Sequence, residues 1–424
     1  MFAEAGYADE DFELPGALTA AQVRANRRQV QPGHGSDFID TRTKNYRVGL
    51  DQSLIENWNL SVEATHRESD SVGFLFATYT SGREVNGVTP RVVGKFNLPT
   101  GPVRLTFGAD LQKARFAYDT AFYTPRNTQT MSDAYLQAVV ALPYALEFVA
   151  GGRAARADND AVDGSGTPYV FGDTVHAGEA GLAWRPLKSL RVFARYERNF
   201  RFAKVDEFTF TGPNCEPGKP LCTQTGDSYE TGIEWQGKSW SAAFSAYRLD
   251  LSNEIAYDPT ATGPFGPGTG ANVNLPATRR DGQSLRLGWQ ALERLKLGAT
   301  LQHVDARITA GTLAGNEVPM VASETATLSA DADLPWQLVL HPEISMIGAR
   351  RLGGDITNSA SELAGYAVTN LALSRNSGAW QFTARVNNLF DTDYAEYGAA
   401  LFGTNYYYPS PGINGMLTVR YVYQ

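Results

Sequence analysis

The stretch "LTVRYVY", residues 417–423, alternates between two kinds of side chain along its length. One face carries Leu417, Val419, Tyr421 and Tyr423, and the other carries Thr418, Arg420 and Val422. Because successive side chains of a strand point to opposite sides of the sheet, this period of two predicts a β-strand. The same period recurs at residues 295–302 and 326–334, so an all-β fold is expected.

Composition supports β-structure and excludes some partners. The 424 residues include 41 glycines, 20 tyrosines and 21 phenylalanines, and only 19% are charged. This mix is richer in glycine and aromatic residues than a typical globular chain, which favours strands joined by many turns. The net charge of −8 argues against a nucleic-acid binder, because such a protein needs a basic face to neutralise phosphates.

No segment reads as a membrane-spanning helix or a signal peptide. Residues 1–19 lack the basic region and the apolar core of a signal peptide. The most apolar segment, residues 138–152, contains Pro143 and Glu147 and is shorter than the roughly 20 apolar residues that a spanning helix needs. A helical membrane protein is therefore excluded.

Short and long connections alternate down the chain. Short turns are predicted at residues 54–57, 97–102, 142–145, 184–189, 235–240, 289–294, 332–337 and 374–379. Long loops rich in Gly, Pro, Asn and Asp are predicted at residues 11–43, 116–132, 157–175, 200–227, 252–281, 305–322, 349–364 and 391–414. A transmembrane antiparallel β-barrel has short periplasmic turns and long extracellular loops, whereas the loops of a soluble sandwich show no such bias.

The pattern also predicts the size and the two faces of the barrel. Eight short turns define eight hairpins, and one further strand near each terminus gives about 18 strands, an even number as in bacterial barrels. All seven tryptophans lie near short turns, which predicts an interfacial girdle: Trp58, Trp184, Trp235, Trp240, Trp289, Trp336 and Trp380. Basic residues within strands are expected to face the lumen, namely Arg191, Arg195, Arg286, Lys296, Arg385 and Arg420.

Cys215 and Cys222 lie in the Gly- and Pro-rich stretch "GPNCEPGKPLCTQTG". A disulfide that staples a loop fits this context and would imply an oxidising compartment. A pair of free thiols is the first alternative. A metal site is the second, and it is disfavoured because no histidine lies nearby.

Catalytic and metal motifs are weak. The five histidines, at positions 34, 66, 176, 303 and 341, are dispersed without metal-ligand spacing. Ser165 lacks the context of a nucleophile elbow, and the glycines of residues 263–270 lack the helix and lysine of a phosphate loop. The sequence therefore predicts a protein that is not an enzyme, with no cofactor and no metal site.

Five motifs occur in an order that carries a family resemblance. They are "NFRFAKVDEFTF" (199–210), "GDSYETGIEW" (226–235), "LPATRRDGQSLRLGW" (275–289), "AGNEVPMVASETATLSADADLP" (314–335), and "VNNLFDTDYAEYG" (386–398) followed by "YYYPSPGINGMLTVRYVYQ" (406–424). In this order the motifs resemble the β-barrel part of a TonB-dependent outer-membrane receptor. The stretch "LPGALTAAQVRANRRQ" (14–29), with Thr19 as the cap of a short helix, resembles an outer loop of the iron-siderophore branch.

The resemblance implies a barrel of 22 strands whose lumen holds an N-terminal plug, preceded by a signal peptide and a TonB box. Residues 1–424 match none of these additional parts. With about 18 of 22 strands present, residues 1–424 are expected to form the barrel portion without the plug and the first strands. The chain is then either part of a longer receptor or a plugless barrel.

The implied function is uptake of a ferric siderophore or a similar scarce chelate across the cell outer membrane of a Gram-negative bacterium. Expected partners are this ligand, outer-membrane lipid and the TonB complex, which would act through the missing N-terminal part; the barrel is expected to be a monomer. Candidate ligand contacts are Tyr123, Arg126, Arg201, Arg350, Arg351, Tyr406 and Tyr407, because arginine and aromatic groups suit anionic chelates. Cobalamin, haem or an oligosaccharide are alternative cargoes. A passive porin-like pore and a secreted β-protein that acts as an adhesin are alternative functions.

Overall fold

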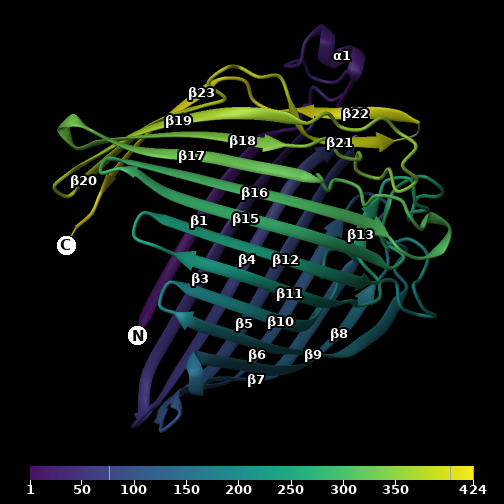
Figure 1. Cartoon of the computed structure of the whole chain (residues 1–424). Coiled ribbons are helices and arrows are strands. Elements are labelled where there is room, and N and C mark those ends of the chain that lie inside the picture. The colour runs from purple at the N-terminus through teal and green to yellow at the C-terminus, as the bar shows by residue number, and fades with distance from the viewer. Residues whose placement is uncertain (76, 402, 424) are drawn as a thin grey trace.

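The computed structural model describes residues 1–75, 77–401 and 403–423, most of which belong to one antiparallel sheet of 18 strands. The sheet contains β1 (Phe2–Glu13), β3 (Phe38–Ile55), β4 (Trp58–Leu75), β5 (Ala77–Leu98), β6 (Gly101–Asp119), β7 (Arg126–Leu142), β8 (Leu146–Val162), β9 (Pro168–Leu187), β10 (Leu190–Arg201), β11 (Gln224–Gln236), β12 (Trp240–Ser252), β15 (Thr278–Leu292), β16 (Leu295–Ile308), β17 (Glu324–Leu334), β18 (Leu338–Ile347), β19 (Tyr366–Ser377), β20 (Trp380–Asn387) and β23 (Asn414–Tyr421). Each strand pairs with the next one of this series. Figure 1 shows the sheet curving so that the purple and blue strands face the teal and green ones across a lumen.

The remaining elements are short and belong to the connections. They are β2 (Leu18–Thr19), α1 (Ala20–Ala25), β13 (Ile255–Asp258), β14 (Ala271–Asn274), β21 (Ala395–Leu401), β22 (Thr404–Pro409) and the 3-10 turns η1 (Pro143–Ala145), η2 (Gly311–Leu313) and η3 (Pro335–Gln337). The predicted cap is confirmed, because the Thr19 side chain accepts a hydrogen bond from the Gln22 backbone at the start of α1. Within the described part of the chain, no helix is long and apolar enough to cross a membrane.

All eight predicted short turns are confirmed, and they lie at one end of the sheet. Two of them share a form in which a proline precedes an aromatic residue with positive φ, Tyr144 at 63° and Trp336 at 63°. The other connections lie at the opposite end, which we call the loop end. The sheet therefore has the two-sided connection pattern that the sequence indicates.

The strands present an apolar outer face and a polar inner face. Trp240 and Trp289 lie opposite each other on β12 and β15, and their rings stack with centroids 4.8 Å apart. The other tryptophans in strands lie on this same face near short turns, which confirms the girdle. The register places all six predicted basic residues, Arg191, Arg195, Arg286, Lys296, Arg385 and Arg420, on the opposite, lumen-facing side.

The wall is taller on one side than on the other. Strand β5 has 22 residues, whereas β20 and β23 have 8 each. Strands β6 to β9 continue into residues 116–132 and 157–175, so the prediction of long loops there is wrong: the actual connections are residues 120–125 and 163–167. Cross-strand ion pairs such as Arg115–Glu84, at 3.0 Å, let polar sequence remain in the sheet beyond the apolar band.

The two edges of the series, β1 and β23, make no strand pair with each other in the described residues. The loops above them do meet. Strand β2, in the loop between β1 and β3, pairs with β22 in the loop between β20 and β23, and β22 pairs with β21. This small second sheet joins the first and last connections at the loop end.

Candidate functional site: the lumen wall and the outer connections

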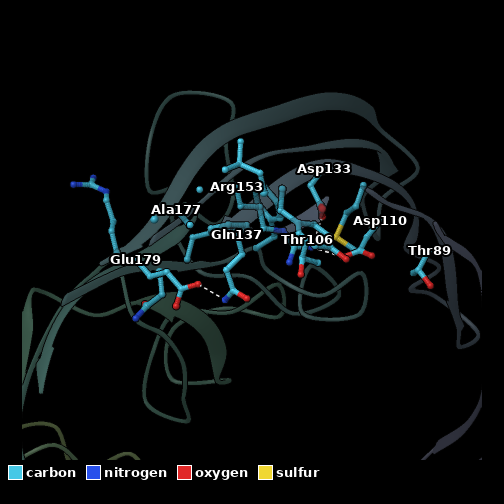
Figure 2. A pocket seen from close by; sticks show the side chains of 18 of the residues that line it. Thr89, Thr106, Asp110, Asp133, Gln137, Arg153, Ala177 and Glu179 are labelled. Atoms are coloured by element: carbon cyan, nitrogen blue, oxygen red, sulfur yellow. Dashed lines mark hydrogen bonds and ion pairs between the residues drawn. The ribbon is translucent and has the colours of Figure 1, made fainter. Parts of the chain in front are cut away.

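A pocket of about 730 Å³ lies on the lumen wall and is formed by strands β4 to β10. Most of its polar lining residues alternate along the strands with the apolar outer residues, so these polar side chains face the lumen. The polar residues that line it include Thr89, Thr106, Asp110, Asp133, Gln137, Arg153 and Glu179. Figure 2 shows Thr106, Asp110, Asp133 and Gln137 near Arg153, with Thr89 set apart.

Charged groups in this pocket are held in a fixed arrangement. The Arg153 guanidinium lies between two carboxylates, with Nη2 at 2.5 Å from Asp110 Oδ2 and 2.6 Å from Asp133 Oδ2. Nearby, Gln137 Nε2 donates a hydrogen bond to Glu179 Oε1 at 2.5 Å. The pocket thus offers acceptors and one shared cation, which suits hydrogen bonding to a polar partner in the lumen.

Two of the sequence-predicted ligand residues, Tyr123 and Arg201, are engaged near the connection between β10 and β11. The Tyr123 hydroxyl donates to the backbone oxygen of Thr209, and its ring stacks on Phe210 at 5.8 Å. Burial raises the pKa of Tyr123 to about 12. Arg201 is bound by both oxygens of Glu207, at 2.8 and 2.6 Å, so its guanidinium is occupied within the chain.

Arg350 and Arg351 lie in the connection between β18 and β19. Arg350 is 6% exposed and donates from Nη2 to the backbone oxygen of Glu396 at 2.6 Å. Its guanidinium also lies over the ring of Tyr366, 5.7 Å from the centroid. Arg351 Nε donates to Glu317 at 2.7 Å, and this hydrogen bond raises the pKa of Arg351. Both arginines thus tie neighbouring loops together.

Tyr406 and Tyr407 lie on β22, where they pair with Thr19 and Leu18 of β2. Tyr407 also lines a cavity of about 190 Å³ between the first and last connections, together with Arg27. Arg126 starts β7, and its Nη2 lies 2.5 Å from Asp119 Oδ1 on the outer face of the wall. The seven predicted residues therefore form separate groups around the loop end and do not converge on one pocket.

The two cysteines are bonded in the structure. The sulfurs of Cys215 and Cys222 are joined across a sequence separation of 7. The backbone of Cys222 is held by Asn274 of β14, whose Oδ1 accepts from the Cys222 N–H at 2.8 Å and whose Nδ2 donates to its carbonyl at 3.0 Å. The disulfide thus sits on the short β13–β14 hairpin.

Sequence reasoning missed the wall pocket and a row of buried polar side chains on β7 and β8. Asn127, Gln129 and Asn159 face the lumen and are 4%, 2% and 4% exposed. Polar residues at every second position of a strand suit an exposed lumen wall as well as a wall that a loop covers. The sequence pattern therefore does not distinguish these buried side chains from exposed ones. Across the described ranges, no group of three or more His, Cys, Asp or Glu side chains could hold a metal ion.

The fold and the polar lumen define a protein of the outer-membrane β-barrel class. Residues 3–389 match the family model described as "TonB dependent receptor-like, beta-barrel", so the chain belongs to this family. The family resides in the Gram-negative outer membrane, so the short turns face the periplasm and the loop end faces the outside. Its members are transporters and not enzymes, which confirms the prediction of a non-enzyme.

Solved structures of receptors share the fold at low sequence identity. The siderophore receptor PiuA from Acinetobacter baumannii superposes with a TM-score of 0.80 and 14% identity over 99% of this chain and 71% of its own. The ferric yersiniabactin uptake receptor FyuA from Yersinia pestis has a TM-score of 0.78 and 15% identity, over 99% of this chain and 68% of its own. The ferric-catecholate import receptor Fiu from K12 E. coli has a TM-score of 0.75 and 13% identity, over 99% of this chain and 72% of its own. No curated protein sequence matches this chain significantly.

Proposed function

We propose that this barrel takes up a ferric siderophore or a similar metal chelate in a process energised by TonB. The observation that carries the proposal is the family barrel with a polar, charged lumen wall beneath outer connections that are rich in arginine and tyrosine. A wet lumen suits a polar cargo, and the loop end provides cation and aromatic groups at its entrance.

The class of cargo is suggested by the structural neighbours. PiuA, FyuA and Fiu are described as siderophore, ferric yersiniabactin and ferric-catecholate receptors, and OprC as a copper transporter. All four names concern metals or their chelates. We therefore favour a siderophore-type metal chelate over cobalamin, haem or an oligosaccharide.

The outer residues would act in two ways. Tyr407, which lines the 190 Å³ cavity, would contact the ligand directly. Arg27 lines the same cavity but is engaged by Ser410 and Asp393, so it would hold the loops in position. Arg350 and Arg351 are already engaged by Glu396 and Glu317, so they would act by holding the loops in position. In this proposal a plug segment fills the lumen against the wall pocket around Arg153, and TonB acts on that segment.

Growth under iron limitation tests the proposal. The complete receptor gene is expressed in a strain that lacks its own siderophore receptors, and a panel of ferric chelates is supplied, with a strain lacking TonB as control. Growth on at least one chelate that requires both the receptor and TonB is expected. Equal solute entry with and without TonB would instead support the passive pore.

A further inference from the structure

The connection between β10 and β11, residues 202–223, folds into the lumen, and we call it the inner loop. On the upper half of β8 the lumen-facing side chains Ala155, Ala157 and Ala161 are only 3%, 3% and 1% exposed. The outward-facing Arg156 and Asp160 between them are exposed. A bare lumen wall would leave both faces accessible, so the inner face of β8 is covered.

Hydrogen bonds show what covers it. Gln129 Nε2 donates to the backbone oxygen of Ala203 at 2.9 Å, and Asn127 Nδ2 donates to that of Val205 at 3.3 Å. Both amides are buried on the lumen face of β7. A buried polar group without a partner costs about 1–3 kcal/mol, so these side chains bind the wall to the inner loop.

Aromatic contacts extend the docking to the neighbouring strands. Phe208 of the inner loop packs against Phe171 on β9, with ring centroids 4.9 Å apart. Phe210 packs against Tyr118 at the end of β6, at 5.5 Å. The small Ala155, Ala157 and Ala161 between these sites let the backbone of the inner loop approach the wall closely. The inner loop therefore lies along the inner face of β6 to β9.

The distal part of the inner loop is fixed as well. The disulfide closes residues 215–222, and Leu221 within this ring packs in a buried cluster with Phe208 and Ile255. Lys219 Nζ lies 3.5 Å from Asp173 on the lumen face of β9. The ring also rests on the β13–β14 hairpin through Asn274. Both ends of the inner loop are thus held against the wall.

We propose that the inner loop is a fixed constriction that sets the size of solute able to pass through the outer half of the lumen. It occupies the lumen beside the tall wall and restricts passage to the space that remains. Arg83 on β5 forms an ion pair with Asp206, which ties the loop to a fifth strand. The proposal concerns the barrel itself and does not depend on the identity of the cargo.

Thiol labelling tests whether the loop covers the wall. Ala157→Cys places a thiol beneath the inner loop, and Ala177→Cys places a matched thiol on β9 in the open pocket. Labelling of the intact protein with a hydrophilic maleimide should be at least tenfold slower at position 157 than at position 177, because the inner loop covers position 157. The native cysteines are bonded to each other and do not react with the maleimide. Equal rates at the two positions would show that the loop does not cover the wall and would overturn the proposal.

Solute exclusion tests the role of the loop. In one variant, residues 204–223 are replaced by a short Gly-Ser linker in the Ala177→Cys background, and the thiol at position 177 is labelled with maleimide-polyethylene glycols of rising size. The variant should be labelled by larger polymers than the same protein with its inner loop. An unchanged size limit in a variant that keeps its heat-modifiable folded band would refute the constriction, because the barrel would then be intact without the loop affecting passage.

Discussion

The guanidinium of Arg27 donates a hydrogen bond from Nη2 to the backbone oxygen of Ser410 at 2.9 Å, which joins positions 383 residues apart. Arg27 also forms an ion pair with Asp393. With the pairing of β2 and β22, this contact connects the first and last outer connections directly. The two loops therefore form one unit above the edge strands β1 and β23.

Replacing Arg27 should loosen this unit. Arg27→Ala removes a charge-assisted hydrogen bond, which contributes about 1.5–3 kcal/mol in such settings, so amide exchange in residues 14–37 and 388–413 should rise by roughly tenfold or more. Arg24→Ala, at an exposed position of α1, is the matched control and should change little. Equal exchange in the two variants would contradict the role of Arg27.

Asn388 should be the sensitive member of the Asn-Asn pair in "VNNLFD". Its side chain is 2% exposed, accepts from the Thr392 N–H at 2.8 Å and donates to the Thr392 carbonyl at 2.9 Å. Asn388→Ala should lower the free energy of unfolding by about 1–3 kcal/mol, because it leaves these backbone groups unpaired. Thermal melting in detergent measures the change, and Asn387→Ala, at a more exposed position, should have the smaller effect. The reverse order would exclude this account.

The two faces of β15 should respond differently to a new charge. Leu285 faces the lipid between Phe244 and Leu301, whereas Ser284 faces the lumen. Leu285→Arg should cost about 2–4 kcal/mol, since a mid-membrane arginine on the lipid face is poorly solvated. Ser284→Arg should be tolerated. The folded fraction of each variant, read from heat-modifiable migration in gels, checks this, and equal loss in both would reject the facing assignment.

Removing the disulfide should act locally. The bond closes residues 215–222 into a small ring. In the chain-entropy account, its loss should destabilise this ring by about 2–3 kcal/mol. Cys215→Ser/Cys222→Ser should speed amide exchange in residues 213–223 and leave the thermal melting of the sheet unchanged. A large fall in the melting temperature would mean that the disulfide supports the barrel itself.

The Tyr123 phenol should lose its proton only at unusually high pH. Its pKa is raised to about 12 by burial, so the neutral phenol is favoured in the folded state. The stability that it contributes is complete below pH 10 and is lost as the pH rises towards 12. The difference in ultraviolet titration between the unchanged protein and Tyr123→Phe isolates this single phenol. A midpoint near the ordinary pKa of 10 would show that Tyr123 is exposed to solvent.

The sequence located the turns and the faces but not the height of the wall. Period-two alternation and the tryptophan positions follow from local geometry and from the membrane interface, so they can be read without coordinates. The first part of β7, residues 126–132, is mostly polar on both faces, and polar sequence is equally suited to a loop. Only pairing across strands, as in Arg115–Glu84, keeps these residues in the sheet.

The candidate site was the least predictable part, for a related reason. Residue type alone marked Arg201 and Arg351 as available cations, yet Glu207 and Glu317 already bind them. The sequence did not predict a role for the amides of Asn127 and Gln129. In the structure they hydrogen-bond to a loop that lies 74 to 78 residues further along the chain. By itself the sequence determined the strand pattern, the membrane faces and the family resemblance. The tertiary structure alone decided which polar groups are free and which are consumed by partners distant in sequence, because only folding brings those partners together.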